Sequence, residues 1–175
     1  MGEVYKARHV ELGTEHAIKV VLPEMVGDQT VAELFRREAS VLRTLRNDAV
    51  VGYDGVFRDE GGRLYLVMEF VTGRPLRALL REDGPMPAAD VARLRDRIAD
   101  GLAAAHDLGI IHRDLSPDNI ILPEGRVDLA KLIDFGIARQ TQSEQATVLG
   151  QDFAGKYRWA SPEQLGLAGG EVDGR

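Results

Sequence analysis

A group of polar side chains able to do chemistry is concentrated in the segment IIHRDLSPDNIIL, residues 110–122. Pairs of isoleucines flank it on both sides. Between them lie an imidazole, a guanidinium, two carboxylates and an amide, from His112, Arg113, Asp114, Asp118 and Asn119. Charged groups next to apolar anchors are costly to bury unless they are paired or used. This segment is therefore the first candidate for a reactive loop, and the question is whether the neutral Ser116 in its middle permits that role.

Two isolated charges, Lys19 and Glu38, interrupt apolar patterns in a correlated way. In HAIKVVL, strand alternation makes both faces apolar, so Lys19 projects into or beside a core. Glu38 falls on the apolar stripe of a helical segment, with Leu34, Phe35, Val41 and Leu42. Burying either charge alone is costly, so we predict an ion pair, and a buried lysine is also a ready donor to a phosphate oxygen. The alternative is a lysine that extends to solvent and a glutamate at the margin of the stripe.

The rest of the sequence predicts the elements that position these groups. Strand patterns occur at 4–9, 15–22, 50–57, 63–70, 120–122 and 131–133, and helical patterns at 31–45, 76–80 and about 87–108. The long helix has a proline at its start and Gly109 as its stop. Strands dominate the first part and helices the second. This predicts a boundary near Thr72-Gly73, between domains 1–71 and 72–175.

Composition narrows the class of protein. The chain has 175 residues, of which 44% are hydrophobic and 29% charged, with a net charge of −6. This acidic balance argues against nucleic acid as the main partner. The sequence contains no cysteine, which excludes disulfides and thiolate metal sites and agrees with a cytoplasmic location. No apolar run is long enough to span a membrane, and the first residues do not form a signal peptide.

Five motifs in register resemble one known family. HRDLSPDN fits the pattern H-R-D-L-x-x-x-N, and Asp134-Phe135-Gly136 follows it as D-F-G. A strand lysine in Ala17-Ile18-Lys19, the helix residue Glu38 and a terminal Ser161-Pro162-Glu163 occur in the order that a kinase requires. The chain therefore resembles a protein kinase catalytic domain, most like the bacterial, eukaryotic-like Ser/Thr kinases. The resemblance implies an α+β, two-lobed protein-kinase-like fold, with an antiparallel sheet plus one helix in the first lobe and a mainly helical, partial second lobe.

The resemblance assigns roles to individual residues. Asp114 is the expected catalytic base, and Asn119 and Asp134 are the expected Mg²⁺ ligands. Lys19, held by Glu38, is expected to bind the α- and β-phosphates of ATP. The other expected ATP-binding residues are Gly2 in the phosphate-covering loop, Val4, Ala17 and Ile121 around adenine, Met68 as gatekeeper, and the backbone of Glu69 and Val71. Leu42, His112 and Phe135 match the internal apolar spine of the family and are expected to be architectural.

Two positions depart from the family in a complementary way. Ser116 stands where Ser/Thr kinases usually have a lysine that neutralises the γ-phosphate, and Lys156 stands where they usually have a threonine. We hypothesise that Lys156 places its ammonium near the position that Ser116 leaves without a charge, and that it is catalytic. The resemblance also implies that both ends are truncated, with the first strand, the early glycines of the phosphate-covering loop and the later helices missing.

The same resemblance suggests a regulatory site. Arg113 directly precedes Asp114, and in kinases with this arginine a phosphate on the activation segment pairs with it. The candidate acceptors are Thr141, Ser143 and Thr147. We hypothesise that Thr147 or a near neighbour is autophosphorylated, the alternative being that these are ordinary loop residues. The arginines of the long helix, Arg93, Arg95 and Arg97, are expected to be solvated.

The function implied is an ATP- and Mg²⁺-dependent protein Ser/Thr kinase, with ATP and a protein substrate as its partners. One alternative is a catalytically inactive pseudokinase that acts as a binding or scaffolding module, particularly for these 175 residues alone. The intact set of expected catalytic residues weighs against it for the whole protein. A small-molecule phosphotransferase is disfavoured by the Ser-Pro-Glu segment and the long activation loop.

Overall fold

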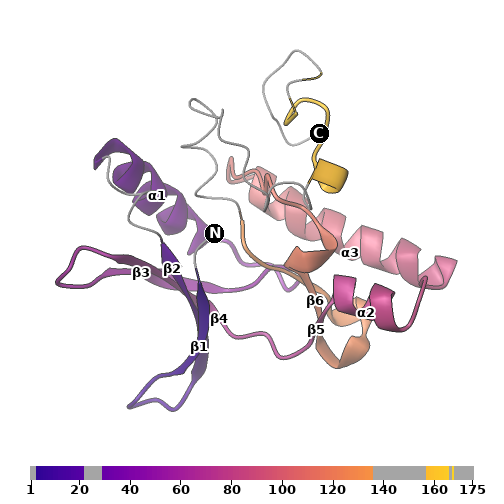
Figure 1. The fold of residues 1–175 in the computed structure, drawn as a ribbon, viewed down its shortest axis with the longest axis horizontal. Coiled ribbons are helices and arrows are strands. Elements are labelled where there is room, and N and C mark those ends of the chain that lie inside the picture. Colours follow the sequence, from indigo (N-terminus) through magenta and orange to yellow (C-terminus); the bar gives the residue numbers. More distant parts are fainter. Residues whose placement is uncertain (1–2, 22–28, 136–156, 166, 168–175) are drawn as a thin grey trace.

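The computed structural model describes residues 3–21, 29–135, 157–165 and 167. Within them, the first part of the chain forms a four-stranded sheet with one helix. The second part forms two helices, a three-stranded sheet and short 3-10 turns. Figure 1 shows the two parts next to each other, with β1–β4 and α1 on the left and α2, α3, β5 and β6 on the right.

The first sheet is an antiparallel unit built from four short strands. They are β1 (Val4–Arg8), β2 (Glu15–Val21), β3 (Tyr53–Arg58) and β4 (Leu64–Glu69). Their order in the sheet is β1-β2-β4-β3. The turn between β3 and β4 needs Gly62, whose φ is 84°, and it is closed by Asp59, whose carboxylate accepts the Arg63 N–H at 2.8 Å.

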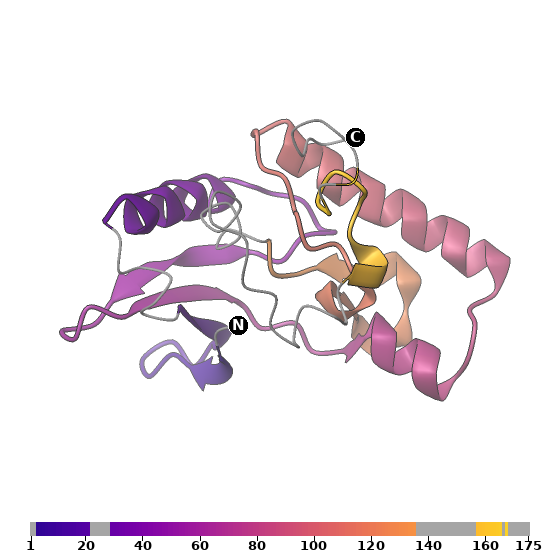
Figure 2. The same cartoon turned by 45° about the horizontal axis from the view of Figure 1, so that its top comes forward.

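Helix α1 (Gln29–Leu42) packs against this sheet and contacts strand β3. It buries Phe35, Ala39 and Leu42, whose spacing places them on one helical face. Strand β4 alternates, with Leu64, Leu66 and Met68 buried. Figure 2 shows α1 lying along the strands of the sheet. The α1 core and the β4 core are continuous, and they hold the first lobe together.

Helices α2 (Leu76–Glu82) and α3 (Ala88–His106) both begin after a proline in extended conformation. Helix α3 ends before Gly109, whose φ is 72°, where the Ile110 N–H donates to the Ala105 carbonyl at 3.0 Å. Its buried stripe consists of Leu94, Ile98, Gly101 and Ala105. The helix predicted at about 87–108 is thus present, and its end points directly into the candidate reactive loop.

A small second sheet carries that loop. Its strands β5 (Arg74–Pro75), β6 (Ile120–Leu122) and β7 (Lys131–Leu132) pair antiparallel in the order β5-β6-β7. Strand β5 was not predicted, because two residues carry no periodicity. The chain enters β5 through Gly73, where an added Cβ would lie 2.7 Å from the Leu122 carbonyl oxygen. The 3-10 turns are η2 (Pro117–Asn119), η3 (Pro123–Gly125), η4 (Val127–Leu129) and η6 (Tyr157–Trp159).

The two parts share one core, to which Leu42 and Leu64 contribute from the first and Leu122, Leu132 and Phe135 from the second. In the described part of the chain, no helix has the length and apolar character needed to cross a membrane.

Candidate active site

Asp114, the expected base, lies in the loop between α3 and β6 and is held by Asn119. The Asn119 side-chain amide donates to the Asp114 backbone carbonyl at 2.7 Å and to its carboxylate Oδ2 at 3.1 Å. Turn η2 positions Asn119, whose backbone N–H donates to the Ser116 carbonyl at 2.9 Å. Because the amide nitrogen is engaged with Asp114, the amide oxygen is the atom that Asn119 can offer to a cation.

Pairing of β6 with β7 brings Asp134 to the same end of the small sheet as Asn119. Asn119 directly precedes β6 and Asp134 follows β7, and the strands are antiparallel. The Ile133 N–H donates to the Asn119 carbonyl at 3.0 Å, which closes this end. A carboxylate and an amide oxygen are hard donors, and Mg²⁺ takes few protein ligands together with phosphate oxygens. The chemistry of Asn119 and Asp134 therefore fits the expected Mg²⁺ site.

His112 links the two loops from inside the core. It is 2% exposed, its Nε2 lies 3.1 Å from the Ile133 carbonyl, and its Nδ1 accepts the Asp114 N–H at 3.3 Å. Burial lowers the pKa of His112, so the ring is neutral and carries its proton on Nε2. Its ring centroid is 4.6 Å from that of Phe135. This burial agrees with the architectural role expected for His112 and Phe135.

Tyr53 completes this cluster and was missed by the sequence analysis. Its ring meets Phe135 edge-on, with centroids 6.4 Å apart, and its hydroxyl accepts the Phe135 N–H at 3.3 Å. Burial raises the pKa of Tyr53, so its hydroxyl stays protonated. The only sequence signal was an aromatic residue within the strand predicted at 50–57, which does not indicate a partner.

The expected ion pair between Lys19 and Glu38 is not the one found. Within the described residues, the Lys19 ammonium pairs with the Asp134 carboxylate. Glu38 lies 3.9 Å from the Arg113 guanidinium. All four side chains are between 21% and 25% exposed, so both pairs are partly desolvated. The prediction that each charge needs a partner was right, but the assignment of the partners was wrong.

The physical reason is that each charge has a nearer opposite charge contributed by the second lobe. Asp134 has a φ of 59°, a left-handed conformation, and its carboxylate meets Lys19 on β2. Helix α1 places Glu38 beside Arg113 instead. Burial raises the pKa of Glu38 and outweighs the opposing effect of the Arg113 charge. Because phosphoryl transfer by a kinase requires the Lys–Glu pair, this arrangement differs from the one needed for catalysis.

Most residues of the expected adenine site lie on adjacent strands. Ala17 on β2 is the register partner of Met68 on β4, and Val4 on β1 is opposite Lys19. Ile121 lies on β6, in the other sheet, and Val71 in the connection between the two sheets. The Glu69 N–H donates to the Gly52 carbonyl at 2.8 Å, so the Glu69 carbonyl is the backbone group that it can offer to adenine.

Several predicted residues lie outside the described part of the chain. They are Gly2, Lys156 and the candidate phosphate acceptors Thr141, Ser143 and Thr147. Ser116 is described, and it is 3% exposed. Its hydroxyl makes no hydrogen bond with any described residue, so this position combines burial with an unpartnered polar atom.

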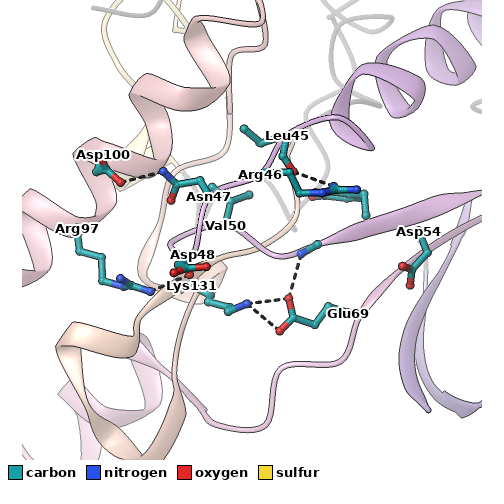
Figure 3. Close-up of a pocket in the computed structure, with 12 residues that line it drawn as sticks. Leu45, Arg46, Asn47, Asp48, Val50, Asp54, Glu69, Arg97, Asp100 and Lys131 are labelled. Atoms are coloured by element: carbon teal, nitrogen blue, oxygen red, sulfur yellow. Dashed lines mark hydrogen bonds and ion pairs between the residues drawn. The ribbon is translucent and has the colours of Figure 1, made fainter. Parts of the chain in front are cut away.

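A pocket of about 680 Å³ lies at the junction of the lobes, and Glu69 is part of its wall. The Glu69 carboxylate accepts two bonds from the Lys131 ammonium, both at 2.8 Å, and one from the Gly52 N–H at 3.1 Å (Figure 3). On another side of the pocket, Asn47 donates to the Asp100 carboxylate at 2.8 Å. These contacts tie β4 to β7 and the α1–β3 segment to α3.

The expectation that the α3 arginines are solvated was wrong for Arg97. Its guanidinium donates to the carbonyls of Ala130 and Asp48, both at 2.7 Å. Arg93 and Arg95 are exposed and pair with Asp90 and Asp96 on the same helix. The helix α2 residue Arg77 also reaches the candidate loop, 2.5 Å from the Asp118 carboxylate. The partners of Arg97 and Arg77 are distant from them in sequence, so no local pattern predicts these contacts.

Comparison with known proteins identifies the family of this chain. The model of the protein kinase domain family matches residues 1–173. The serine/threonine-protein kinase pkn2 of Myxococcus xanthus is 42% identical over 100% of this chain, which spans 21% of that protein. The serine/threonine-protein kinase PknL of Mycobacterium tuberculosis is 38% identical over 93% of this chain, which spans 40% of that protein. The chain thus spans less than half the length of these curated relatives.

Solved structures show the same fold. The PknI kinase domain of Mycobacterium tuberculosis superposes with a TM-score of 0.69 at 31% identity, covering 80% of this chain and 55% of that one. Rad53 in complex with AMP-PNP superposes with a TM-score of 0.69 at 29% identity, covering 78% of this chain and 35% of that one. The two-lobed fold predicted from the sequence is confirmed. The chain belongs to the protein kinase domain family.

Proposed function

We propose that the protein containing this chain transfers the γ-phosphate of ATP to a serine or threonine hydroxyl of a protein substrate. The observation that carries the proposal is the set of contacts at Asp114. Asn119 holds its carboxylate, and the neutral His112 holds its backbone. A base fixed in this way is suited to accept the proton of an attacking hydroxyl.

The other residues have supporting roles in the proposal. Lys19 holds the α- and β-phosphates. Glu38 orients Lys19 once Lys19 has separated from Asp134 and Glu38 has separated from Arg113. Asp134 and Asn119 would hold Mg²⁺, which would neutralise phosphate charge. The adenine ring would lie between Val4, Ala17 and Ile121, beside Met68, and would form hydrogen bonds with the backbone of Glu69 and Val71. Gly2 belongs to the loop that covers the phosphates.

The test is transfer of labelled γ-phosphate from ATP to dephosphorylated casein and to the protein itself, in the full-length protein. Asp114→Asn keeps the size of the side chain and removes the base, so we expect kcat to fall at least about 100-fold. Omission of Mg²⁺ should abolish transfer. Equal activity of Asp114→Asn and wild type would overturn the role of Asp114.

A pseudokinase that binds partners without transfer is the second candidate, because the Lys19–Asp134 and Glu38–Arg113 pairs differ from the catalytic arrangement. Binding of ATP without Asp114-dependent transfer would favour it. A small-molecule phosphotransferase has less support, since the relatives compared above carry the name of serine/threonine-protein kinases. A cytoplasmic site of action is part of the proposal. The proposed reaction uses ATP, and a chain without cysteine is compatible with a reducing compartment.

Two further hypotheses belong to the proposed activity. Lys156 supplies the charge that Ser116 does not, so Lys156→Ala should lower kcat far more than Ser116→Ala, and equal small effects would contradict the exchange. Thr147 or a near neighbour is autophosphorylated and pairs with Arg113. Phosphopeptide mapping of active protein that found no phosphate between residues 137 and 160 would contradict this second hypothesis.

A further inference from the structure

Gln164, which no kinase motif in the sequence includes, connects the Ser-Pro-Glu segment to the catalytic loop. Its amide nitrogen donates to the backbone carbonyl of Arg113 at 2.8 Å. Its amide oxygen accepts the Ser161 backbone N–H at 3.0 Å and lies 3.3 Å from the Ser161 hydroxyl. Both ends of one half-buried amide are therefore used, one on each segment.

The contact with Ser161 belongs to a motif that starts helical turns. Residues 161–164 read S-x-x-Q, in which the fourth side chain accepts the N–H of the serine. The turn that follows is closed by the Leu165 N–H, which donates to the Ser161 carbonyl at 3.2 Å. Glutamate serves this motif as well as glutamine, because only an acceptor oxygen is needed.

The contact with Arg113 has a different requirement. Arg113 has a φ of 58°, a conformation that is costly for a residue other than glycine and that needs support from its surroundings. Its carbonyl belongs to the peptide unit that leads into Asp114. An amide can donate to this carbonyl, whereas a carboxylate has no proton to give. Glutamine meets both requirements and glutamate meets only one.

We propose that Gln164 is a positioning residue for phosphoryl transfer, which fixes the Arg113 carbonyl and through it the direction of Asp114. The proposal rests on the proposed kinase function, because it concerns the orientation of the base. The expected ATP contacts, from Lys19 and the backbone of Glu69, do not involve Gln164. Loss of this support should therefore lower kcat and leave KM for ATP nearly unchanged, since small misplacements of a catalytic group are costly.

The test compares wild type, Gln164→Glu and Gln164→Ala in the full-length protein, with transfer to dephosphorylated casein and the thermal midpoint as readouts. Gln164→Glu keeps the acceptor for Ser161 but places a carboxylate against the Arg113 carbonyl. We expect its kcat to fall about ten-fold or more, with KM for ATP within about two-fold and a thermal midpoint that falls less than in Gln164→Ala. Gln164→Ala removes both contacts, and we expect both its kcat and its thermal midpoint to be lower than those of wild type.

The outcomes separate this proposal from the proposed function. A wild-type kcat in Gln164→Glu overturns the positioning role, while Asp114-dependent transfer still upholds the kinase assignment. A thermal midpoint that falls equally in Gln164→Glu and Gln164→Ala also overturns it, because the side chain would then act only in folding. A wild-type protein without transfer that depends on Asp114 overturns the kinase function and the positioning role together.

Discussion

At the scale of single residues, neutral groups hold the candidate base in place. Asp114 receives bonds from the Asn119 amide and gives its backbone N–H to the His112 ring. Both partners are almost fully buried. This arrangement suits a base that must accept a proton.

His112 should make the stability of the protein sensitive to mild acid. Its pKa is lowered in the folded state, so the unfolded chain takes up this proton first as pH falls below about 6.5. Stability present above that pH is therefore lost below it. In His112→Phe we expect a lower thermal midpoint at pH 8, because two hydrogen bonds are lost, and a shallower decline from pH 7 to pH 5. Parallel declines in the two proteins would contradict this prediction.

At the scale of elements, helix α1 carries Glu38, which is paired with a residue other than the expected Lys19. Glu38 meets Arg113, while the proposed phosphoryl transfer requires it to meet Lys19. The helix buries Phe35, Ala39 and Leu42 against the sheet but leaves Glu38 in a partly desolvated position. Stability of the described arrangement and activity therefore make opposite demands on this side chain.

Glu38→Gln should separate these demands. The raised pKa of Glu38 means that the folded state binds its proton more tightly than the unfolded chain does, so its charge costs stability above about pH 4.3. We expect the variant to be at least as stable as wild type at pH 7.5, with the difference shrinking as pH falls toward 4.3. Its transfer rate should drop, because an amide cannot hold the Lys19 ammonium as a carboxylate does. A variant that is both less stable and fully active would contradict the argument.

The entry into β5 offers a test of backbone packing. In Gly73→Ala the new methyl group would lie 2.7 Å from the Leu122 carbonyl oxygen and 2.8 Å from the Ile121 side chain. We expect a loss of about 1–3 kcal/mol in the free energy of unfolding, from urea titration, because backbone must shift. Gly52→Ala is the matched control, since the nearest atom to its methyl group would be 3.6 Å away. Equal effects of the two substitutions would show that the close approach is not limiting.

At the scale of the whole molecule, the two lobes are joined by more than one connection. The Leu132 N–H donates to the Ala49 carbonyl at 2.7 Å, and the Val51 N–H donates to the Leu132 carbonyl at 2.9 Å. The Glu69–Lys131 pair lies beside this backbone contact, at the pocket in Figure 3. These contacts therefore connect the two lobes next to Glu69, which is one of the residues of the expected adenine site.

A double-mutant cycle should measure this connection. Glu69→Gln, Lys131→Met and the double variant would be compared by thermal unfolding. Because the Glu69 side chain is 42% exposed, we expect a coupling energy of only about 0.5–1 kcal/mol. The single variants should also raise KM for ATP, since Glu69 would lose its fixed position next to adenine. A coupling energy of zero would show that the pair does not join the lobes energetically.

The sequence by itself determined most of the elements and the choice of candidate reactive groups. Periodicity, prolines and Gly109 located the strands of the first sheet and both helices of the second lobe, because these signals are local. The motif HRDLSPDN identified Asp114 and Asn119, which the structure brings into contact.

Only the tertiary structure decided which groups pair with which. Lys19 meets Asp134 and Glu38 meets Arg113, whereas the pattern of charges predicted a Lys19–Glu38 pair. The partners of Tyr53 and Gln164 were equally hidden, because each is far away in sequence. Strand alternation and helical stripes predict that a charged side chain is buried. The position of one lobe against the other decides which opposite charge that side chain meets.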